Sequence, residues 1–426
     1  MEDTVPNTVR APSLRVEEER FFANFQALAS IGATPDGGVH RPAFSDAHLA
    51  ARRWFLDTAA RAGLETHVDG AGNHSVRLCC GPPGAPVLLL GSHLDSVPHG
   101  GRFDGALGVT AALEVVQTVK DHGLSLNTHL EAIDFTDEEG RYANLVGSLA
   151  VTGQLERAHL RAPRGGRQAF FDALQRAGLT EESLFAARRD PETLAGYLEL
   201  HIEQGSRLAA AGHQIGVVTA IVGIRSFTIR FLGRADHAGT TPMDQRRDAA
   251  QGAAAFTLAV RELMLNRFLD CVATVGNMSF EPGVFNVVPQ AASVSLEFRA
   301  SAEEVLGQVE AALLNEAQGI ATRLHLGLEV EHLDSTPPAR MDAKAQAAIA
   351  AACRSLGLQS ASMPSGAGHD GQALATICPV GMIFVPSVDG RSHSAREFTA
   401  WQDCVNGANV LLQAVLTLAG LAQAGR

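Results

Sequence analysis

The first half of the chain alternates short apolar runs with helical patterns, which is typical of an α/β domain. The apolar runs that predict strands are 65–68, 75–80, 87–91, 127–136 and 197–202. Helices are predicted at 45–63, where Ser45 or Asp46 is a suitable N-cap, and directly after Asp104. The polar segment 154–192 also has a helical pattern, and we expect it to lie on the surface.

The middle of the chain has a different pattern. Phe227, Ile229 and Phe231 alternate with other residues, which predicts a half-buried strand. The strands and helices predicted here, in chain order, are 226–231, 247–265, 271–280, 293–299, 301–322 and 326–333. Ser301 and Glu304 are spaced as a capping box at the start of the second helix. The order β-α-β-β-α-β predicts a ferredoxin-like α+β module.

The pattern of the first half then returns, with a helix predicted at 343–356 and an apolar strand at 380–386. Residues 410–421 are read as a C-terminal amphipathic helix. We therefore predict an α/β domain with a central mixed sheet and a smaller α+β domain inserted into it. The predicted boundaries are 1–214 and 331–426 for the α/β domain and 215–330 for the inserted domain.

Charge and cysteine content narrow the classes of function. The formal net charge of −12 argues against a nucleic-acid-binding surface, which needs a clustered basic face. No apolar stretch approaches the length needed to cross a bilayer. The six cysteines show neither a C-x-x-C pair nor a disulfide framework, which indicates thiols in a reducing compartment. A cytoplasmic protein is expected.

Ligand-type side chains recur in five segments that end a predicted strand or open a loop. These segments are 91–95, 101–105, 134–140, 201–205 and 390–394. Open α/β sheets bind ligands at the carboxyl ends of their strands, so we expect these segments to converge. Mixed histidine and carboxylate ligands suit zinc, manganese, cobalt or nickel better than magnesium or calcium.

Three of the acidic residues suggest how such a site works. Two metal ions that share an activated water need a bridging carboxylate, and Asp104 at a helix start is the natural bridge. A second carboxylate has to accept the proton of the water and return it to the leaving nitrogen. Glu138 and Glu139 are adjacent, so their side chains diverge, and one of them can bind metal while the other faces the water.

Long motifs in these segments resemble the M20 metallohydrolase superfamily, in particular its amidohydrolase branch. The matching motifs are GSHLDSVPHGGRFDGALGV at 91–109, TDEEG at 136–140, HIEQG at 201–205, HAGTTPM at 237–243, and SGAGHDG with MIFVPS within 365–387. That branch contains N-carbamoyl-L-amino acid hydrolases, β-ureidopropionases and allantoate amidohydrolases. The resemblance covers nearly the whole chain beyond residue 20, the inserted domain included.

The resemblance implies two divalent metal ions per subunit (zinc, manganese, cobalt or nickel), each held by three side chains. The two ligand sets share one residue and are His93, Asp104 and His201 for one metal, and Asp104, Glu139 and His393 for the other. It also implies that Glu138 is the general base and acid. Asp95 would orient His93, because a histidine that binds metal donates its other ring N–H.

Further residues match substrate-binding positions of the resembled family. His237 would reach across a homodimer to support the oxyanion of the tetrahedral intermediate, although it is also placed to cap a loop. Asn286 and Arg299 resemble contacts to the carboxylate of the substrate. Gln204 and His369 resemble further pocket residues. The inserted domain would then be both the dimer surface and a lid over the substrate.

The strand at 293–299 leaves two roles open for Arg299. Val294, Leu296 and Phe298 share one face of this strand, so Arg299 lies on the opposite, polar face. A guanidinium there can bind a carboxylate through two parallel hydrogen bonds. It can equally pair with the neighbouring Glu297.

The predicted function is metal-dependent hydrolysis of an N-carbamoyl amino acid to the amino acid, ammonia and carbon dioxide. Allantoate and N-acyl amino acids are the alternative substrates, since fold and metal site are shared within the family. The expected partners are a small substrate with a carboxylate and a second copy of the chain, with no nucleic acid and no membrane. A non-catalytic metal-binding relative is disfavoured, because such a protein has little reason to retain Glu138 beside a complete ligand set.

Overall fold

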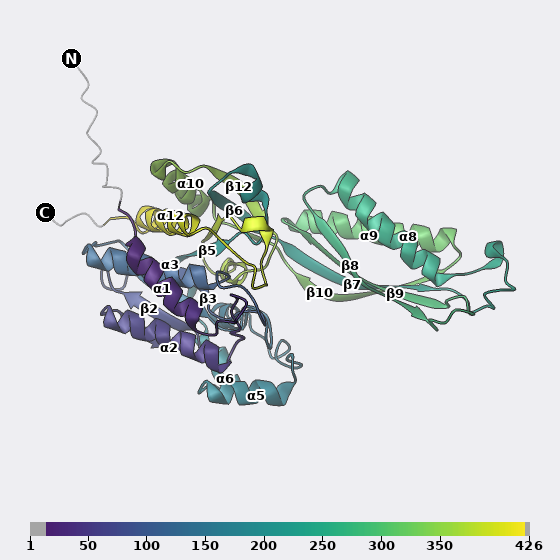
Figure 1. Ribbon diagram of the computed structural model, residues 1–426, viewed down its shortest axis with the longest axis horizontal. Helices are drawn as coiled ribbons and strands as arrows, with labels where there is room; N and C mark the ends of the chain where they lie inside the picture. The colour runs from purple at the N-terminus through teal and green to yellow at the C-terminus, as the bar shows by residue number, and fades with distance from the viewer. Residues whose placement is uncertain (1–13, 422–426) are drawn as a thin grey trace, which may run out of the picture. The chain divides into compact units, whose positions relative to one another are not determined.

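The computed structural model describes residues 14–421, so the outermost ends of the predicted α/β domain lie outside the described residues. The chain forms two compact units (Figure 1). The first takes in the chain up to Thr219, Met341–Met363 and Ala367 onward, and the second takes in Ala220–Arg340 and Pro364–Gly366. The insertion was expected at 215–330, but its last strand continues to Thr336.

Within the described residues the larger sheet has nine strands, in the order β1-β2-β4-β3-β5-β13-β6-β11, with β12 paired to β6. Their bounds are β1 Glu65–Val68, β2 His74–Leu78, β3 Val87–His93, β4 His129–Phe135, β5 Leu194–Ile202, β6 Ile215–Ile221, β11 Ala339–Arg340, β12 Ser360–Ser365 and β13 Val380–Val385. The central strands β4, β3, β5 and β13 are parallel, and antiparallel strands flank them. The prediction of a mixed sheet is confirmed.

Helices cover this sheet, and their apolar faces form the main core. They are α1 Glu18–Ser30, α2 Asp46–Arg61, α3 Ala106–Asp121, α10 Ala343–Leu356 and α12 Trp401–Ala419, with the shorter α7 Arg207–Ala211, α11 Asp370–Leu374 and η4 Val388–Gly390. Ser45 caps α2 as predicted, because its side chain accepts the His48 N–H. All seven residues of β3 are buried, as expected for a parallel strand covered on both faces.

The C-terminal helix differs from its prediction. α12 begins at Trp401, well before residue 410, and most of its residues are buried. It packs against α3, α10 and the sheet, so several sides of the helix meet apolar neighbours. A helix surrounded in this way does not need a polar face along its whole length.

The segment 154–192 is helical as predicted, but it is not only a surface excursion. It contains α5 Arg167–Arg176, α6 Glu181–Leu184 and the 3-10 turns η1 Phe185–Ala187 and η2 Pro191–Thr193, and it follows α4 Val146–Thr152. Leu160, Phe170 and Leu184 are fully buried and pack with Phe44 and Val146 in a small core of their own. A few apolar residues spaced among many polar ones were enough to form this core.

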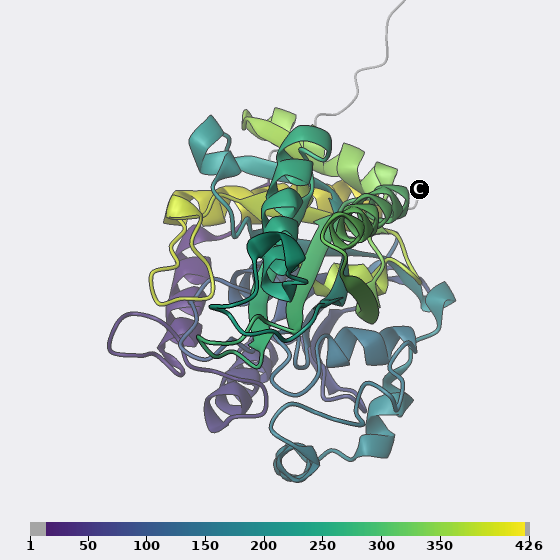
Figure 2. The same cartoon turned by 90° about the vertical axis from the view of Figure 1, so that its right-hand side faces the viewer.

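The second unit has the predicted ferredoxin-like order of elements. Its elements are β7 Gly223–Leu232, η3 Met243–Gln245, α8 Ala249–Arg267, β8 Val272–Glu281, β9 Ala291–Ala300, α9 Glu303–Arg323 and β10 Gly327–Thr336. The four strands form an antiparallel sheet in the order β10-β7-β9-β8. α8 and α9 lie side by side on one face of this sheet (Figure 1, Figure 2).

The predicted capping box of α9 is wrong. The N-cap is Ala302, and no side chain caps the helix there. Ser301 therefore lies one residue before the cap and Glu304 falls at the second helical position. A capping box needs these two residues at the cap and at the third helical position, so the reciprocal hydrogen bonds cannot form.

The core of the second unit explains the alternation seen in its sequence. Val294, Leu296 and Phe298 are buried against the two helices, while the residues between them are partly exposed. Phe227 stacks on Phe298 with ring centroids 5.8 Å apart. The prediction that these strand residues share an apolar face is confirmed.

Within the described residues 14–421, no helix is both long enough and apolar enough to cross a bilayer.

Two positions on α8 test the core of the second unit. Phe256 is fully buried, whereas Leu258 on the same helix is 69% exposed. We expect Phe256→Ala to lower the free energy of unfolding by about 3–5 kcal/mol, because a large apolar side chain is lost and a cavity remains. The matched Leu258→Ala variant is expected to change it by less than about 0.5 kcal/mol. Urea denaturation followed by circular dichroism measures both, and equal losses would contradict this packing.

Candidate metal centre

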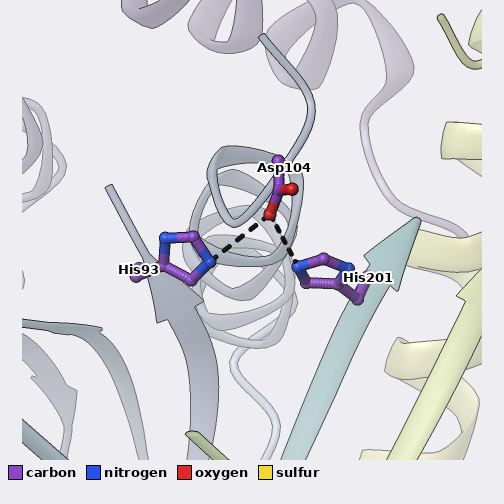
Figure 3. Close-up of side chains that lie close together, drawn as sticks. All are labelled: His93, Asp104 and His201. Carbon is purple, nitrogen blue, oxygen red and sulfur yellow. Dashed lines mark ion pairs between the residues drawn. The ribbon is translucent and has the colours of Figure 1, made fainter. Parts of the chain in front are cut away.

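One carboxylate and two imidazoles meet where two parallel strands of the larger sheet end. His93 is the last residue of β3, His201 lies near the end of the neighbouring strand β5, and Asp104 lies two residues before the start of α3. Figure 3 shows both rings directed at the Asp104 carboxylate. The Nε2 atoms of His93 and His201 lie 3.5 and 3.1 Å from Asp104 Oδ1. The predicted convergence of these three residues is therefore present.

The other oxygen of Asp104 faces a second group. His393 Nε2 lies 3.3 Å from Asp104 Oδ2 and 3.5 Å from Glu139 Oε2. In each group of three, the donor atoms all lie within 4.8 Å of one another. Asp104 is common to both groups, and it presents one oxygen to each. This is the arrangement that a carboxylate bridging two cations needs.

The hydrogen bonds of the two buried histidines fit a role as metal ligands. His93 Nδ1 lies 3.0 Å from the backbone carbonyl of Asp95, and His201 Nδ1 lies 2.9 Å from that of Ile202. A carbonyl only accepts, so both Nδ1 atoms carry the proton. In the neutral rings each Nε2 then presents its lone pair toward Asp104, which is how metal-binding histidines are commonly held.

The acidic residues of the site also fit bound cations. Glu139 Oε1 is buried and has no hydrogen-bond partner among the described residues. Burial, together with the nearby Asp104, raises the pKa of Glu139 to about 7. Burial likewise raises the pKa of Glu138 well above its ordinary value, and Asp370 and Glu139 add to this. So many buried carboxylates repel one another unless positive charge lies between them.

The pKa of Asp104 is shifted in the opposite direction, downward. Burial would raise its pKa, but His201, His393 and His93 outweigh burial and hold the pKa well below the usual range. Asp104 therefore stays ionised at neutral pH. A histidine and carboxylate set of this kind suits zinc, manganese, cobalt or nickel.

Asp95 is placed differently from the expectation that its carboxylate orients His93. The carboxylate lies 3.8 Å from His93 Nδ1, and the backbone carbonyl of Asp95 makes the shorter contact. Its two oxygens instead accept the backbone N–H groups of Glu138 and Glu139, at 3.3 and 3.1 Å. Asp95 therefore holds the turn that carries both glutamates.

The adjacent glutamates diverge as predicted from their position after a strand. Glu138 Oε2 lies 3.6 Å from His93 Nε2, whereas Glu139 faces His393. Asp137, just before them, has a positive φ of 53°, and its carboxylate accepts three backbone N–H groups of the following turn. These bonds fix the turn from which the two side chains separate.

Two predicted pocket residues lie beside the same cluster. Gln204 Nε2 donates to Asp104 Oδ2 at 2.8 Å. The ring of His369 lies edge-on to that of His201, with centroids 4.4 Å apart. Both residues are therefore close to the proposed ligands.

Two residues at the cluster were not singled out from the sequence. Ser392 Oγ lies 3.0 Å from Asp104 Oδ2 and 2.8 Å from Glu397 Oε2. A carboxylate four residues after a candidate ligand was the available signal for Glu397. Nothing in the sequence indicated that its side chain lies against the backbone of Asp104.

The other predicted substrate residues belong to the second unit. An isolated β-bridge joins His237 to Val287, which places Asn286 next to His237, and both side chains are exposed. His237 Nδ1 accepts the Gly239 N–H, so the suggestion that it caps a loop has support.

Arg299 is paired with Glu297, the alternative left open by the sequence. Its Nε and one terminal nitrogen donate to Glu297 Oε1 at 2.9 and 2.8 Å. Its other terminal nitrogen donates to the Gly366 carbonyl at 2.9 Å. Some guanidinium N–H donors are left for a ligand, because arginine carries five.

The family model described as peptidase family M20/M25/M40 matches residues 89–417, a range that holds both groups of three and the second unit. The chain belongs to this family. The resemblance seen in the sequence motifs is thereby confirmed.

Relatives that are similar over nearly their full length indicate the branch of the family to which the chain is most similar. The N-carbamoyl-L-amino acid amidohydrolase of Geobacillus stearothermophilus is 40% identical over 95% of this chain and 99% of its own length. The allantoate amidohydrolase of Escherichia coli K12 is 33% identical over 92% of this chain and 96% of its own. A solved amidase of the hydantoinase/carbamoylase family from Burkholderia multivorans is 37% identical, with a TM-score of 0.87 over 96% of this chain and 99% of its own.

Removal of divalent metal ions is expected to destabilise the protein. Without cations the buried carboxylates repel one another, and a ligand that binds only the folded chain stabilises it by about 2.7 kcal/mol at a free concentration of 100 Kd. Treatment with a chelator should lower the melting temperature, and zinc or manganese should restore it. Calorimetry together with metal analysis tests this. An unchanged melting temperature after complete metal removal would contradict it.

Proposed function

We propose that this protein hydrolyses an N-carbamoyl amino acid to the free amino acid, ammonia and carbon dioxide. The single observation that carries the proposal is the carboxylate of Asp104 shared between two groups of ligand-type side chains, with Glu138 beside them. Full-length similarity to an N-carbamoyl-L-amino acid amidohydrolase supports the substrate class. One water molecule is consumed in the balanced reaction.

The two groups would each hold one divalent metal ion. His93, Asp104 and His201 would bind one, and Asp104, Glu139 and His393 the other. Zinc, manganese, cobalt and nickel all fit these donors. When bound, such ions supply Lewis acidity, which eases deprotonation of water and polarises a carbonyl oxygen.

Glu138 would move the proton. It is fixed by the backbone hydrogen bond to Asp95, and its side chain is directed to the cluster rather than to solvent. Its raised pKa suits a group that takes a proton from water near neutral pH and later gives it to the nitrogen of the leaving amine. Loss of that amine leaves a carbamic acid, which separates into ammonia and carbon dioxide.

Four further residues would bind and orient the substrate. Asn286 and Arg299 would bind its carboxylate, and Gln204 and His369 would line the pocket beside the metal ligands. The Glu297 pairing keeps the Arg299 guanidinium in place and leaves N–H donors for the carboxylate.

His237 would stabilise the oxyanion from a neighbouring subunit. Its exposed side chain in the second unit is consistent with a role in another copy of the chain. We therefore propose a homodimer in which the second unit, Ala220–Arg340, is both the dimer surface and a lid. A cytoplasmic location is part of the proposal, and it is supported by the six unpaired cysteines.

Allantoate is the second candidate substrate, favoured by the similarity to an allantoate amidohydrolase. It also carries a ureido group and a carboxylate, so the same residues would serve. N-acyl amino acids are the third class, and they would release an amine without ammonia or carbon dioxide.

The first test is ammonia release by the metal-loaded protein from N-carbamoyl-L-amino acids, N-carbamoyl-β-alanine and allantoate, with amine release followed for N-acetyl amino acids. We expect the highest kcat/KM on an N-carbamoyl amino acid. Glu138→Gln is expected to lower kcat by about 10²- to 10⁴-fold while metal content stays unchanged, because only proton transfer is removed. Turnover at the wild-type rate in this variant would rule out Glu138 as the base.

Arg299 is tested through KM. Arg299→Ala is expected to raise KM for carboxylate substrates by roughly 10- to 100-fold with a smaller change in kcat, since a charged hydrogen bond to the substrate is lost. Arg230→Ala is the matched control, because Arg230 pairs with Glu281 and Glu329 in the same unit. Steady-state kinetics measure both parameters. Equal KM values in the two variants would show that Arg299 does not bind the substrate.

A further inference from the structure

Glu397 lies outside both groups of ligand-type side chains and is only 4% exposed. Its Oε1 accepts the backbone N–H groups of Phe103 and Asp104 at 2.9 and 3.0 Å. Its Oε2 accepts from Ser392 Oγ at 2.8 Å. Three donors thus satisfy one buried carboxylate, and both of its oxygens are used within the protein.

These bonds join two segments that are far apart in the chain. Phe103 and Asp104 lead into α3, whereas Ser392 directly precedes His393. Ser392 Oγ also lies 3.0 Å from Asp104 Oδ2. A serine has one hydroxyl proton, so it donates to one of the two carboxylates at a time and lies between them in either case. Glu397 therefore contacts both the backbone of Asp104 and the side chain of Ser392, the residue before His393.

His393 depends on such support more than the other two histidines do. Its side chain is 51% exposed, compared with 2% for His93 and 1% for His201. Its φ of 54° lies in the left-handed region, which is uncommon for residues other than glycine and costs of order 1–3 kcal/mol. The Glu397 N–H donates to the Ser394 carbonyl at 3.0 Å and closes the turn that directly follows His393.

Gly101 makes room for this carboxylate. A Cβ atom at Gly101 would lie 2.0 Å from Glu397 Cδ, which no real side chain permits. Gly101 does not have a positive φ, so its backbone conformation does not demand glycine. The close approach of Glu397 is therefore the steric reason for glycine at this position.

We propose that Glu397 is a positioning residue that sets the geometry between Asp104 and His393. It would thereby control the affinity of the metal ion held by Asp104, Glu139 and His393. This inference rests on the proposed function, because it assumes that this group holds a metal ion. Glu397 is not itself a ligand, since N–H and O–H donors occupy both of its oxygens.

The test is a competition titration of the full-length, metal-stripped protein with zinc and a chromophoric chelator. We expect Glu397→Ala to weaken one of two binding events by roughly 10- to 100-fold, as is typical when a residue that orients a metal ligand is lost. Gly101→Ala should have the same effect by displacing the carboxylate. Glu397→Gln should retain most of the affinity, because its amide oxygen can accept both N–H groups and its NH₂ can donate to Ser392 Oγ.

Glu114→Ala is the matched control. Glu114 is a fully buried carboxylate, and its hydrogen bonds among the described residues go to the Glu17 N–H, Arg20 and Thr118 rather than to the cluster. Its loss should lower the melting temperature and leave both zinc affinities as in the wild type. If Glu397→Ala does not fold, Ser392→Ala is the second variant. It should weaken the same binding event to a smaller extent.

The outcomes separate this inference from the proposed function. Wild-type affinity for both metal ions in Glu397→Ala would overturn the positioning role, as would a loss in Glu397→Gln as large as that in Glu397→Ala. In both cases the proposed function still stands if the wild-type protein binds two metal ions and hydrolyses ureido substrates. A wild-type protein that binds no zinc would overturn the proposed function and the positioning role together.

Discussion

The structure of the site depends on one carboxylate that serves two groups of side chains. Asp104 directs Oδ1 toward His93 and His201 and Oδ2 toward His393. A carboxylate can do this only if its backbone is held firmly, because a small rotation would favour one group over the other. Asp104 lies directly before Gly105, the N-cap of α3, and its N–H donates to Glu397. The rest of the site is arranged around that fixed point.

Two strands of the larger sheet place the two buried histidines beside Asp104. β3 and β5 are parallel neighbours, so the ends that carry His93 and His201 lie at the same edge. Glu199, two residues before His201, accepts a hydrogen bond from Ser92 Oγ at 2.8 Å. This bond links β5 to β3 next to the two histidines. Strands thus carry the buried His93 and His201, whereas the exposed His393 lies in a loop that hydrogen bonds must hold.

Electrostatics explain why so many acids gather in a poorly hydrated place. Burial raises the pKa of Glu138, Glu139 and Asp370, and in each case other acids of the site raise it further. Natural proteins retain such clusters where a cation or a proton transfer uses them. The chain is similar both to an N-carbamoyl-L-amino acid amidohydrolase and to an allantoate amidohydrolase. Membership of the family therefore does not by itself identify the substrate.

The sequence by itself determined the order of the elements, the ferredoxin-like module and the identity of the residues that converge at the strand ends. These follow from local periodicity and from the rule that parallel strands end at one edge. Only the tertiary structure decided which groups Asp95 and Glu397 bind, and that 154–192 packs with Phe44 and Val146 in a separate small core. Glu397 meets Asp104 across 293 positions of the chain. Hydrogen bonds between side chains and distant backbone leave no periodic signal, because packing alone brings the two groups together.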